Sequence, residues 1–276
     1  MLGLTTKKRS RGAAAVVTGA GSGIGAAFAA ELAQRGGAVV CSDIDDAAAQ
    51  RTADAITAQQ GKAVAVHCDA SKIDDVGNLA AAAQDFFDGP PTLVINNAGV
   101  GAGGTPIGEV PLEDWTWTLG INLWGPIHGC HVFTPILREA GYGGIINVAS
   151  AAAFGAAPGM AAYNVSKAGV LSLSETLAAE LSGTGIAVTV LCPTFVKTNI
   201  VETGRITSDS ADLAAKLMRW TGFSATKVAR TCLDTHDRGG LYCMPQLDAK
   251  IGWDIKRFAP ETYTRALGLL SRARPH

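Results

Sequence analysis

Short apolar runs alternate with longer amphipathic segments along most of this chain. Apolar runs of a few residues are typical of β-strands that are buried on both faces. Strands are predicted at Ala13–Val17, Ala38–Ser42, Ala63–His67, Thr92–Ile95, Gly144–Ala149, Ile186–Leu191 and, at the end of the pattern, Leu241–Met244.

The segments between these runs have the apolar spacing of helices, and several end at glycines. Helices are predicted at Gly23–Arg35, Asp46–Gln60, Ile73–Phe87, Leu112–Ala140 and Tyr163–Leu181. The segment Leu112–Ala140 is predicted to be one or two helices, with kinks at Pro126 and Pro135. Strands that alternate with helices build βαβ units, so the fold class is α/β. We expect a single-domain, doubly wound parallel sheet (a Rossmann fold) with helices on both faces.

No change in composition divides the 276 residues into two domains. We therefore expect residues 1–276 to form one domain. Mixed polar and apolar sequence interrupts the pattern near 199–226, and a tail with apolar anchors occupies 250–276.

Composition narrows the function classes. Because 47% of the residues are hydrophobic and only 17% are charged, the chain can bury a large core. The net charge is −1 and the only basic cluster, Lys7–Arg11, is interpreted as a solvated N-terminus, so no nucleic-acid partner is expected. The basic start followed by Gly12–Val17 superficially resembles a signal peptide, but its apolar run is too short, and no run is long enough to span a membrane. No membrane partner and a cytoplasmic location are therefore expected. The six cysteines are scattered, which favours reduced thiols over disulfides and predicts no metal site.

Tyr163 and Lys167 lie four residues apart at the start of a predicted helix. This spacing places both side chains on one helical face. An ammonium beside a phenol favours the phenolate, so Lys167 is expected to lower the pKa of Tyr163 and prepare it for proton exchange with an alcohol or carbonyl. The pair alone also fits an ordinary surface helix.

A glycine-rich turn, Thr18–Gly25, joins the first predicted strand to the first predicted helix. Gly19, Gly23 and Gly25 allow a tight turn and let a pyrophosphate approach the helix N-terminus. Asp43 ends the second strand, where an acidic residue meets ribose hydroxyls and repels a 2′-phosphate, so NAD is favoured over NADP. Asp69 ends the third strand and is expected either to bind the adenine amine or to cap the next helix.

Together these motifs resemble the short-chain dehydrogenase/reductase family over about Ala13–Thr198. The turn has the form TGxxxGxG, and the segments Asn96–Gly99 (NNAG) and Pro193–Thr198 resemble further family motifs. Ser150 precedes Tyr163 by thirteen residues, as in the family.

The resemblance implies a catalytic set. Tyr163 would be the general acid/base, Lys167 would tune it and bind the nicotinamide ribose, and Ser150 would bind the substrate oxygen. Asn122 would hold a water that links Lys167 to solvent. The implied cofactor-binding residues are Gly19, Ser22, Gly23, Ile24, Gly25, Asp43, Asp69, Ala70, Asn97, Ala98, Gly99, Tyr163, Lys167, Pro193, Val196 and Thr198. Thr198 also fits a helix cap, and the side chains of Asn96–Gly99 also fit a structural role.

The segment near 199–226 is the natural substrate lid, and small residues near Ser150 leave room for a sizeable ligand. The expected partner is a hydrophobic secondary alcohol or ketone, and its candidate contacts are Ala152, Phe154, Met160, Phe195, Leu217 and Trp220. The same apolar residues also fit packing of the lid or of a subunit contact. The resemblance further implies a homodimer or homotetramer.

We therefore expect an NAD-dependent alcohol dehydrogenase or ketone reductase. Two alternatives stay open: a nucleotide-sugar epimerase or dehydratase, which normally carries a larger C-terminal substrate domain, and a non-catalytic dinucleotide-sensing protein, which normally lacks the tyrosine or lysine.

Overall fold

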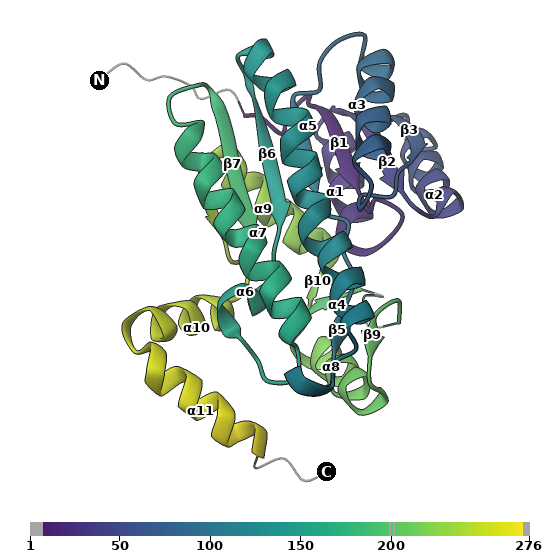
Figure 1. Ribbon diagram of the computed structural model, residues 1–276. Helices are drawn as coiled ribbons and strands as arrows, with labels where there is room; N and C mark the ends of the chain where they lie inside the picture. Colours follow the sequence, from purple (N-terminus) through teal and green to yellow (C-terminus); the bar gives the residue numbers. More distant parts are fainter. Residues whose placement is uncertain (1–7, 199, 201, 273–276) are drawn as a thin grey trace.

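A seven-stranded parallel sheet forms the centre of the computed structural model, which describes residues 8–198, 200 and 202–272 (Figure 1). The strand order is β11-β7-β6-β4-β1-β2-β3. From β1 the chain adds strands toward one edge of the sheet, and from β4 it adds them toward the other edge, so the switch point lies between β1 and β4. This is the predicted doubly wound sheet, and the predicted fold class is confirmed. The strands are β1 (Ala14–Thr18), β2 (Ala38–Asp43), β3 (Lys62–His67), β4 (Leu93–Asn96), β6 (Gly143–Val148), β7 (Ile186–Leu191) and β11 (Tyr242–Cys243).

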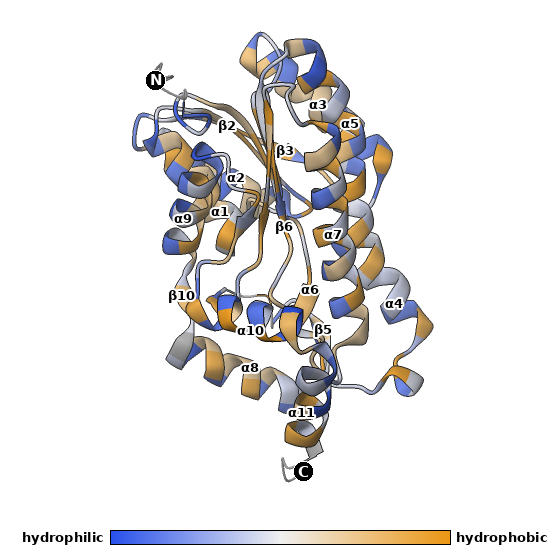
Figure 2. Ribbon diagram, turned by 90° about the vertical axis from the view of Figure 1, so that its left-hand side faces the viewer, coloured by the Kyte–Doolittle hydropathy of each residue, from blue (hydrophilic) through white to orange (hydrophobic). Residues whose placement is uncertain are grey.

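Helices cover both faces of the sheet because parallel neighbours are joined by crossover connections (Figure 2). One face carries α1, α2 and α9, and its core includes the fully buried Phe28, Leu32 and Leu233. The other face carries α3, α5 and α7, with Phe133 and Leu137 in its core. The bounds are α1 (Gly23–Gln34), α2 (Asp46–Thr57), α3 (Ile73–Phe87), α5 (Gly125–Ala140), α7 (Ala161–Glu180) and α9 (Ala225–Asp237).

The segment Leu112–Ala140 is a continuous helical run that contains a π-helical turn. It forms α4 (Leu112–Leu119), a π-helical turn (Gly120–Trp124) and α5. Pro126 is the second residue of α5, directly after the π-helical turn, and Pro135 lies within α5.

The chain after β7 holds helices that the pattern did not predict. Helix α9 has a narrow apolar stripe among many polar residues, and the C-terminal tail forms α10 (Leu247–Phe258) and α11 (Pro260–Arg272). A short helix α6 (Ala152–Gly155) follows Ser150. Parts of three predicted segments, namely Lys7, Asn199, Val201 and residues 273–276, lie outside the described residues.

Two small parallel sheets anchor the predicted lid. Strand β5 (Ala102–Gly103) pairs with β9 (Arg205–Ile206), and β8 (Val196–Lys197) pairs with β10 (Phe223–Ser224). Between them lies α8 (Ser208–Thr221), and a short 3₁₀ turn (Ile107–Glu109) precedes α4. The predicted lid segment therefore contains a helix whose two ends are each held by a strand pair.

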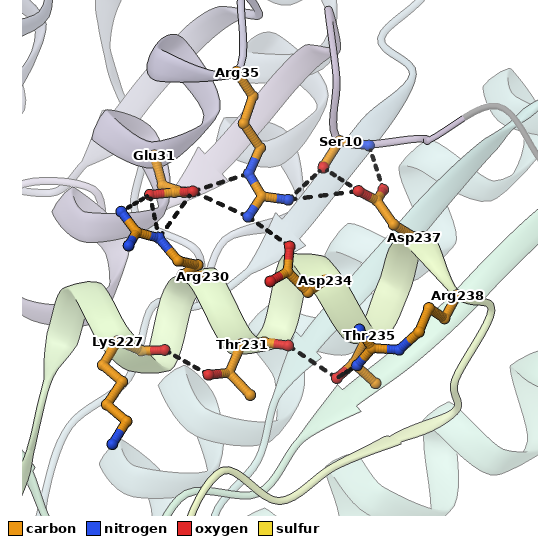
Figure 3. Close-up of polar contacts among 10 residues, drawn as sticks. All are labelled: Ser10, Glu31, Arg35, Lys227, Arg230, Thr231, Asp234, Thr235, Asp237 and Arg238. Carbon is orange, nitrogen blue, oxygen red and sulfur yellow. Dashed lines mark hydrogen bonds and ion pairs between the residues drawn. The ribbon is translucent and has the colours of Figure 1, made fainter.

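A buried ionic network ties the N-terminal segment to α1 and α9 (Figure 3). The guanidinium of Arg35 donates to Glu31 at 3.0 Å, to Asp234 at 2.8 Å and to the Ser10 hydroxyl at 2.9 Å. The carboxylate of Asp237 accepts hydrogen bonds from the Ser10 backbone N–H at 2.8 Å and from its hydroxyl at 2.7 Å. The network holds α9 against the C-terminal end of α1, the end opposite the Gly-rich turn.

All six cysteines are free and buried. The described residues include no cluster of three or more His, Cys, Asp or Glu side chains placed to hold a metal ion. Within the same residues, no helix combines the length and apolarity needed to cross a bilayer.

Candidate active site

Ser150, Tyr163 and Lys167 converge at the carboxyl end of the sheet. Ser150 follows β6, and the other two residues lie in the first turns of α7. The side chains of Ser150 and Tyr163 are hydrogen-bonded to each other. The Lys167 Nζ atom lies 5.7 Å from the centre of the Tyr163 ring. The structure therefore brings together the three residues that the sequence singled out.

The electrostatics of Tyr163 differ from the prediction. Burial raises the pKa of Tyr163, and the hydrogen bond with Ser150 only partly opposes this change. The expectation of a pKa lowered by Lys167 is therefore wrong for the protein without ligands. The reason is that Lys167 donates its hydrogen bond to the Val148 carbonyl at 3.0 Å, while burial penalises the phenolate.

Lys167 is almost fully buried, with 3% of its surface exposed. Burial lowers the pKa of Lys167 from 10.5 to about 8. Its ammonium therefore stays mostly protonated at neutral pH but loses its proton more readily than that of an exposed lysine.

Asn122 lies within the π-helical turn and is fully buried. Its amide makes two hydrogen bonds with the backbone of Val100: Oδ1 accepts from the N–H at 2.7 Å, and Nδ2 donates to the carbonyl at 2.9 Å. A Cβ atom on Gly99 would lie 3.1 Å from Asn122 Oδ1 and 3.4 Å from Lys167 Nζ. Asn122 and Lys167 thus both lie against Gly99, where a larger residue would contact both side chains.

The Gly-rich turn forms a tight cradle. Gly19 and Gly23 have positive φ angles of 64° and 54°, which few other residues adopt. A Cβ atom on Gly25 would collide with the Gly19 carbonyl. Ser22 is the N-cap residue of α1, yet its hydroxyl makes no capping bond. The first N–H groups of α1 are therefore available to an anionic ligand.

Asp43 faces this cradle from the end of β2. Its carboxylate accepts a hydrogen bond from the Gly21 N–H at 2.8 Å and another from the Asp45 N–H at 3.1 Å. A Cβ atom on Gly21 would lie 2.8 Å from the same carboxylate. A negative charge therefore stands directly beside the turn.

Asn97 braces the turn from β4, a role that the sequence left open. Its Nδ2 donates to the carbonyls of Thr18 at 2.9 Å and Gly19 at 3.1 Å. The Thr18 hydroxyl in turn accepts from the backbone N–H groups of Asn97 and Ala98 at 3.0 and 3.1 Å. On the far side, a Cβ on Gly23 would lie 3.1 Å from a carbon of Thr198, so Thr198 also borders the cradle.

Asp69 caps its own turn rather than pointing freely outward. It accepts from the Ser71 hydroxyl at 2.7 Å and pairs with Lys72 at 3.4 Å. Burial alone would raise the pKa of Asp69, but these contacts outweigh it and lower the pKa. Lys72, not Asp69, is the N-cap residue of α3.

The remaining predicted cofactor residues line the same edge of the sheet. Ala70 is buried beside Gly125, and its carbonyl contacts His128 at 3.1 Å. The Pro193 carbonyl accepts from the Ala151 N–H at 2.9 Å, and Val196 is buried in β8. Ile24 packs against the core in the first turn of α1.

The substrate candidates fall into three environments. Ala152, Met160 and Phe195 are half-buried in the segments around Ser150, Tyr163 and Val196. Phe154 is only 5% exposed and packs edge-on against Trp253 of α10, with ring centres 5.1 Å apart. On the lid helix, Leu217 is half-buried and Trp220 is 80% exposed.

Contacts across long sequence distances complete the surroundings of the site. Arg205 in β9 pairs with Asp114 of α4 at 2.6 Å, and its guanidinium lies 4.4 Å from the centre of the Trp117 ring. A Cβ atom on Gly155 would lie 3.9 Å from the hydroxyl of Tyr263 in α11. The sequence did not predict these pairings, because the charged and aromatic residues that form them lie far apart along the chain.

Comparison with known proteins identifies a family. Residues 13–209 match the short chain dehydrogenase family. The probable oxidoreductase EphD of Mycobacterium tuberculosis (strain ATCC 25618 / H37Rv) is 40% identical over 188 residues, which cover 68% of this chain and 31% of that protein. The chain thus spans about a third of the length of EphD.

Two further similarities extend this result. The 1-deoxy-11-beta-hydroxypentalenate dehydrogenase of Streptomyces exfoliatus is 42% identical over 191 residues, which cover 68% of this chain and 69% of that enzyme. A short chain dehydrogenase/reductase from Burkholderia phymatum, solved in complex with NAD, superposes with a TM-score of 0.86 at 33% identity. That superposition covers 92% of this chain and 96% of the other.

Proposed function

Because this chain belongs to the short-chain dehydrogenase family of oxidoreductases, we propose that it interconverts a hydrophobic secondary alcohol and its ketone with NAD as cofactor. The observation that carries the proposal is the convergence of Ser150, Tyr163 and Lys167 beside the Gly-rich cradle. The similar Burkholderia phymatum protein is described in complex with NAD.

The cradle fits a dinucleotide. The open N–H groups at the start of α1 would bind the pyrophosphate, and the glycines leave room for its close approach. The Asp43 carboxylate would accept hydrogen bonds from the adenosine ribose and repel a 2′-phosphate, which favours NAD over NADP. Thr198, which borders Gly23, would lie over the cofactor from the lid side.

In this proposal Tyr163 exchanges the proton of the substrate oxygen at its hydroxyl, and the Ser150 hydroxyl donates a hydrogen bond to the same oxygen. When bound, an oxidised nicotinamide would supply the hydride acceptor and a positive charge, which would oppose the effect of burial that raises the pKa of Tyr163. Lys167 keeps a second positive charge near the phenol and passes protons onward. The amide of Asn122 is occupied by Val100, so a relay water would bind the backbone carbonyls of the π-helical turn.

The hydrophobic substrate class rests on the half-buried residues around Tyr163. Met160 and Phe195 are apolar, Ala152 is small, and Leu217 lies on the lid. A pocket of this kind, with one polar corner, suits a bulky apolar alcohol. The relative named for 1-deoxy-11-beta-hydroxypentalenate supports a compound of that class.

The test is to incubate the protein with NAD and a panel of secondary alcohols and to follow NADH absorbance. We expect Tyr163→Phe to reduce turnover at least about 100-fold, because general acid–base catalysis contributes at least that much. Tyr142→Phe is the matched control, since Tyr142 lies near Arg9, outside the site. Full turnover by Tyr163→Phe would contradict the mechanism.

The cofactor preference has its own test. Asp43→Ala should weaken NAD binding and relax discrimination against NADP, whereas Asp46→Ala, at an exposed neighbouring carboxylate, should leave the preference unchanged. Equal use of both cofactors by the wild type would refute the role given to Asp43.

A further inference from the structure

Helix α10 carries an apolar stripe that faces away from the protein body. Leu247, Ile251, Ile255 and Phe258 are 70%, 50%, 49% and 83% exposed. At about 100° per residue, their spacing places all four within an arc of about 80°. They form one continuous stripe, which we call the α10 stripe.

The opposite side of α10 is the side that packs on the body. Ala249 is 2% exposed, and Trp253 contacts the rings of Phe154 and Tyr242 at 5.1 and 5.6 Å. Figure 1 shows α10 and α11 as an arm at the edge of the molecule, beyond the sheet. Helix α10 therefore carries apolar side chains on both of its long sides, one packed on the body and one exposed.

We propose that the α10 stripe is the contact surface for a second copy of this chain, packed as an antiparallel α10 pair around a two-fold axis. In this arrangement Leu247 lies opposite Phe258 of the partner subunit, and Ile251 lies near Ile255 of the partner subunit. The stripe is nearly symmetric about its midpoint, as an isologous contact requires. The inference does not depend on the proposed reaction.

Charges beside the stripe complement the same arrangement. Lys250 and Asp254 lie on one flank of the stripe, and neither forms an ion pair with another described residue. The antiparallel pairing brings Lys250 level with Asp254 of the partner subunit, about one residue along the axis, on the same side of the contact. Two such ion pairs would form for each two-fold axis.

Charge also argues against a lipid surface as the occupant. Helices that lie on membranes carry Lys and Arg beside their apolar face. Here Asp254 stands between the stripe and the cations Lys250 and Arg257 on one border, and Asp248 lies on the other, so the stripe lacks a uniformly basic border.

The area is sufficient for association. A fully exposed side chain of this size offers roughly 150–200 Å², so the four exposed fractions amount to roughly 400–500 Å² on each copy. Together with flanking polar residues, the pair reaches the roughly 1,000 Å² expected of a biological interface.

The first test measures mass by sedimentation velocity over a range of protein concentrations. We expect Ile251→Glu to halve the mass of the wild-type assembly at micromolar concentration. The matched control is Ile73→Glu, another exposed helical isoleucine at 41%, which should keep the wild-type mass. A monomeric wild type, or equal masses for the wild type and Ile251→Glu, would overturn the proposal. So would wild-type binding to phosphatidylcholine–phosphatidylserine vesicles that Ile251→Glu abolishes without a change in mass.

The second test measures how the charges at positions 250 and 254 affect self-association, and it does not depend on whether the Ile251→Glu variant folds. Lys250→Asp and Asp254→Lys should each weaken self-association at least tenfold, because like charges then meet across the axis. An equimolar mixture of the two variants should recover association, since unlike charges meet only in the mixed pair. Each variant also places like charges at positions 250 and 254 of its own helix. That repulsion within the helix is unchanged in the mixture, so it cannot explain a recovery of association. Failure of the mixture to associate would refute the antiparallel pairing.

Discussion

His236 should make the stability of this protein depend on pH. The side chain is fully buried, and its Nδ1 lies 2.9 Å from the Thr189 hydroxyl. Thr189 donates its single proton to the Gly240 carbonyl at 2.7 Å, so it must accept from His236. Nδ1 therefore carries the proton of the neutral ring, and the buried Nε2, which packs over Gly144, has no described hydrogen-bond partner.

Protonation of His236 would place a charged N–H against the sheet. Burial, helped by the positive charge of Arg9 and opposed by Asp237, lowers the pKa of His236 from 6.5 to about 4. The folded protein then binds fewer protons than the unfolded chain between these values. The stabilisation is complete above about pH 6.5 and is lost as the pH falls toward 4. Between pH 7 and 4.5 the loss from this one group is about 2 kcal/mol.

Urea unfolding of the wild type and of His236→Asn at pH 7 and 4.5 measures this contribution. Asparagine keeps a donor toward Thr189 but does not titrate, so the variant should lose about 2 kcal/mol less than the wild type between the two pH values. His67→Asn replaces an exposed histidine whose side chain is 54% accessible, and it should follow the wild type to within about 0.5 kcal/mol. Protein concentration must be fixed, because association changes apparent stability. Equal pH-dependent losses in His236→Asn and the wild type would refute the reasoning.

Two further predictions concern the scaffold, both read by urea unfolding. Arg35→Met should lower the free energy of unfolding by about 2–3 kcal/mol, because it removes donors from buried carboxylates. Arg230→Met, at a side chain 58% exposed, should lower it clearly less than Arg35→Met does, and equal losses would contradict this ranking. Gly129→Ala should cost about 2–4 kcal/mol, because its Cβ would collide with the buried amide of Asn96. As a control, Gly77→Ala lies in open space within α3 and should stabilise the protein by about 0.5–1 kcal/mol. A Gly129→Ala protein as stable as the wild type would exclude the clash with Asn96.

Local pattern was enough to predict most of the sheet. The bounds of α3 and β7 agree with the prediction, because each has a clear period and glycines nearby. Tyr163 and Lys167 were predictable for the same reason: one helical turn separates them, and their relative position is fixed by local geometry.

Features that depend on distant partners were not predictable. The direction of the Tyr163 pKa shift follows from burial and from the hydrogen bond that Lys167 donates to the Val148 carbonyl. The spacing of residues along the sequence reveals neither of these. The brace from Asn97 to the Gly-rich turn joins residues 79 positions apart. Helix α9 was missed because its apolar stripe is narrow and its packing on α1 is supported by the ionic network around Arg35.

The two strand pairs at the ends of α8 allow the side chains of the predicted lid to change without moving its ends. Backbone hydrogen bonds hold its entry, where the Thr207 N–H donates to Gly103 at 3.1 Å, and its exit, where the Phe223 N–H donates to Phe195 at 3.1 Å. Backbone bonds do not depend on the side chains between them. The residues from 208 to 221 can therefore diverge, or be exchanged between relatives, while the entry and exit points stay in register with the proposed site at Tyr163. In this architecture the choice of substrate could evolve separately from the proposed hydride transfer.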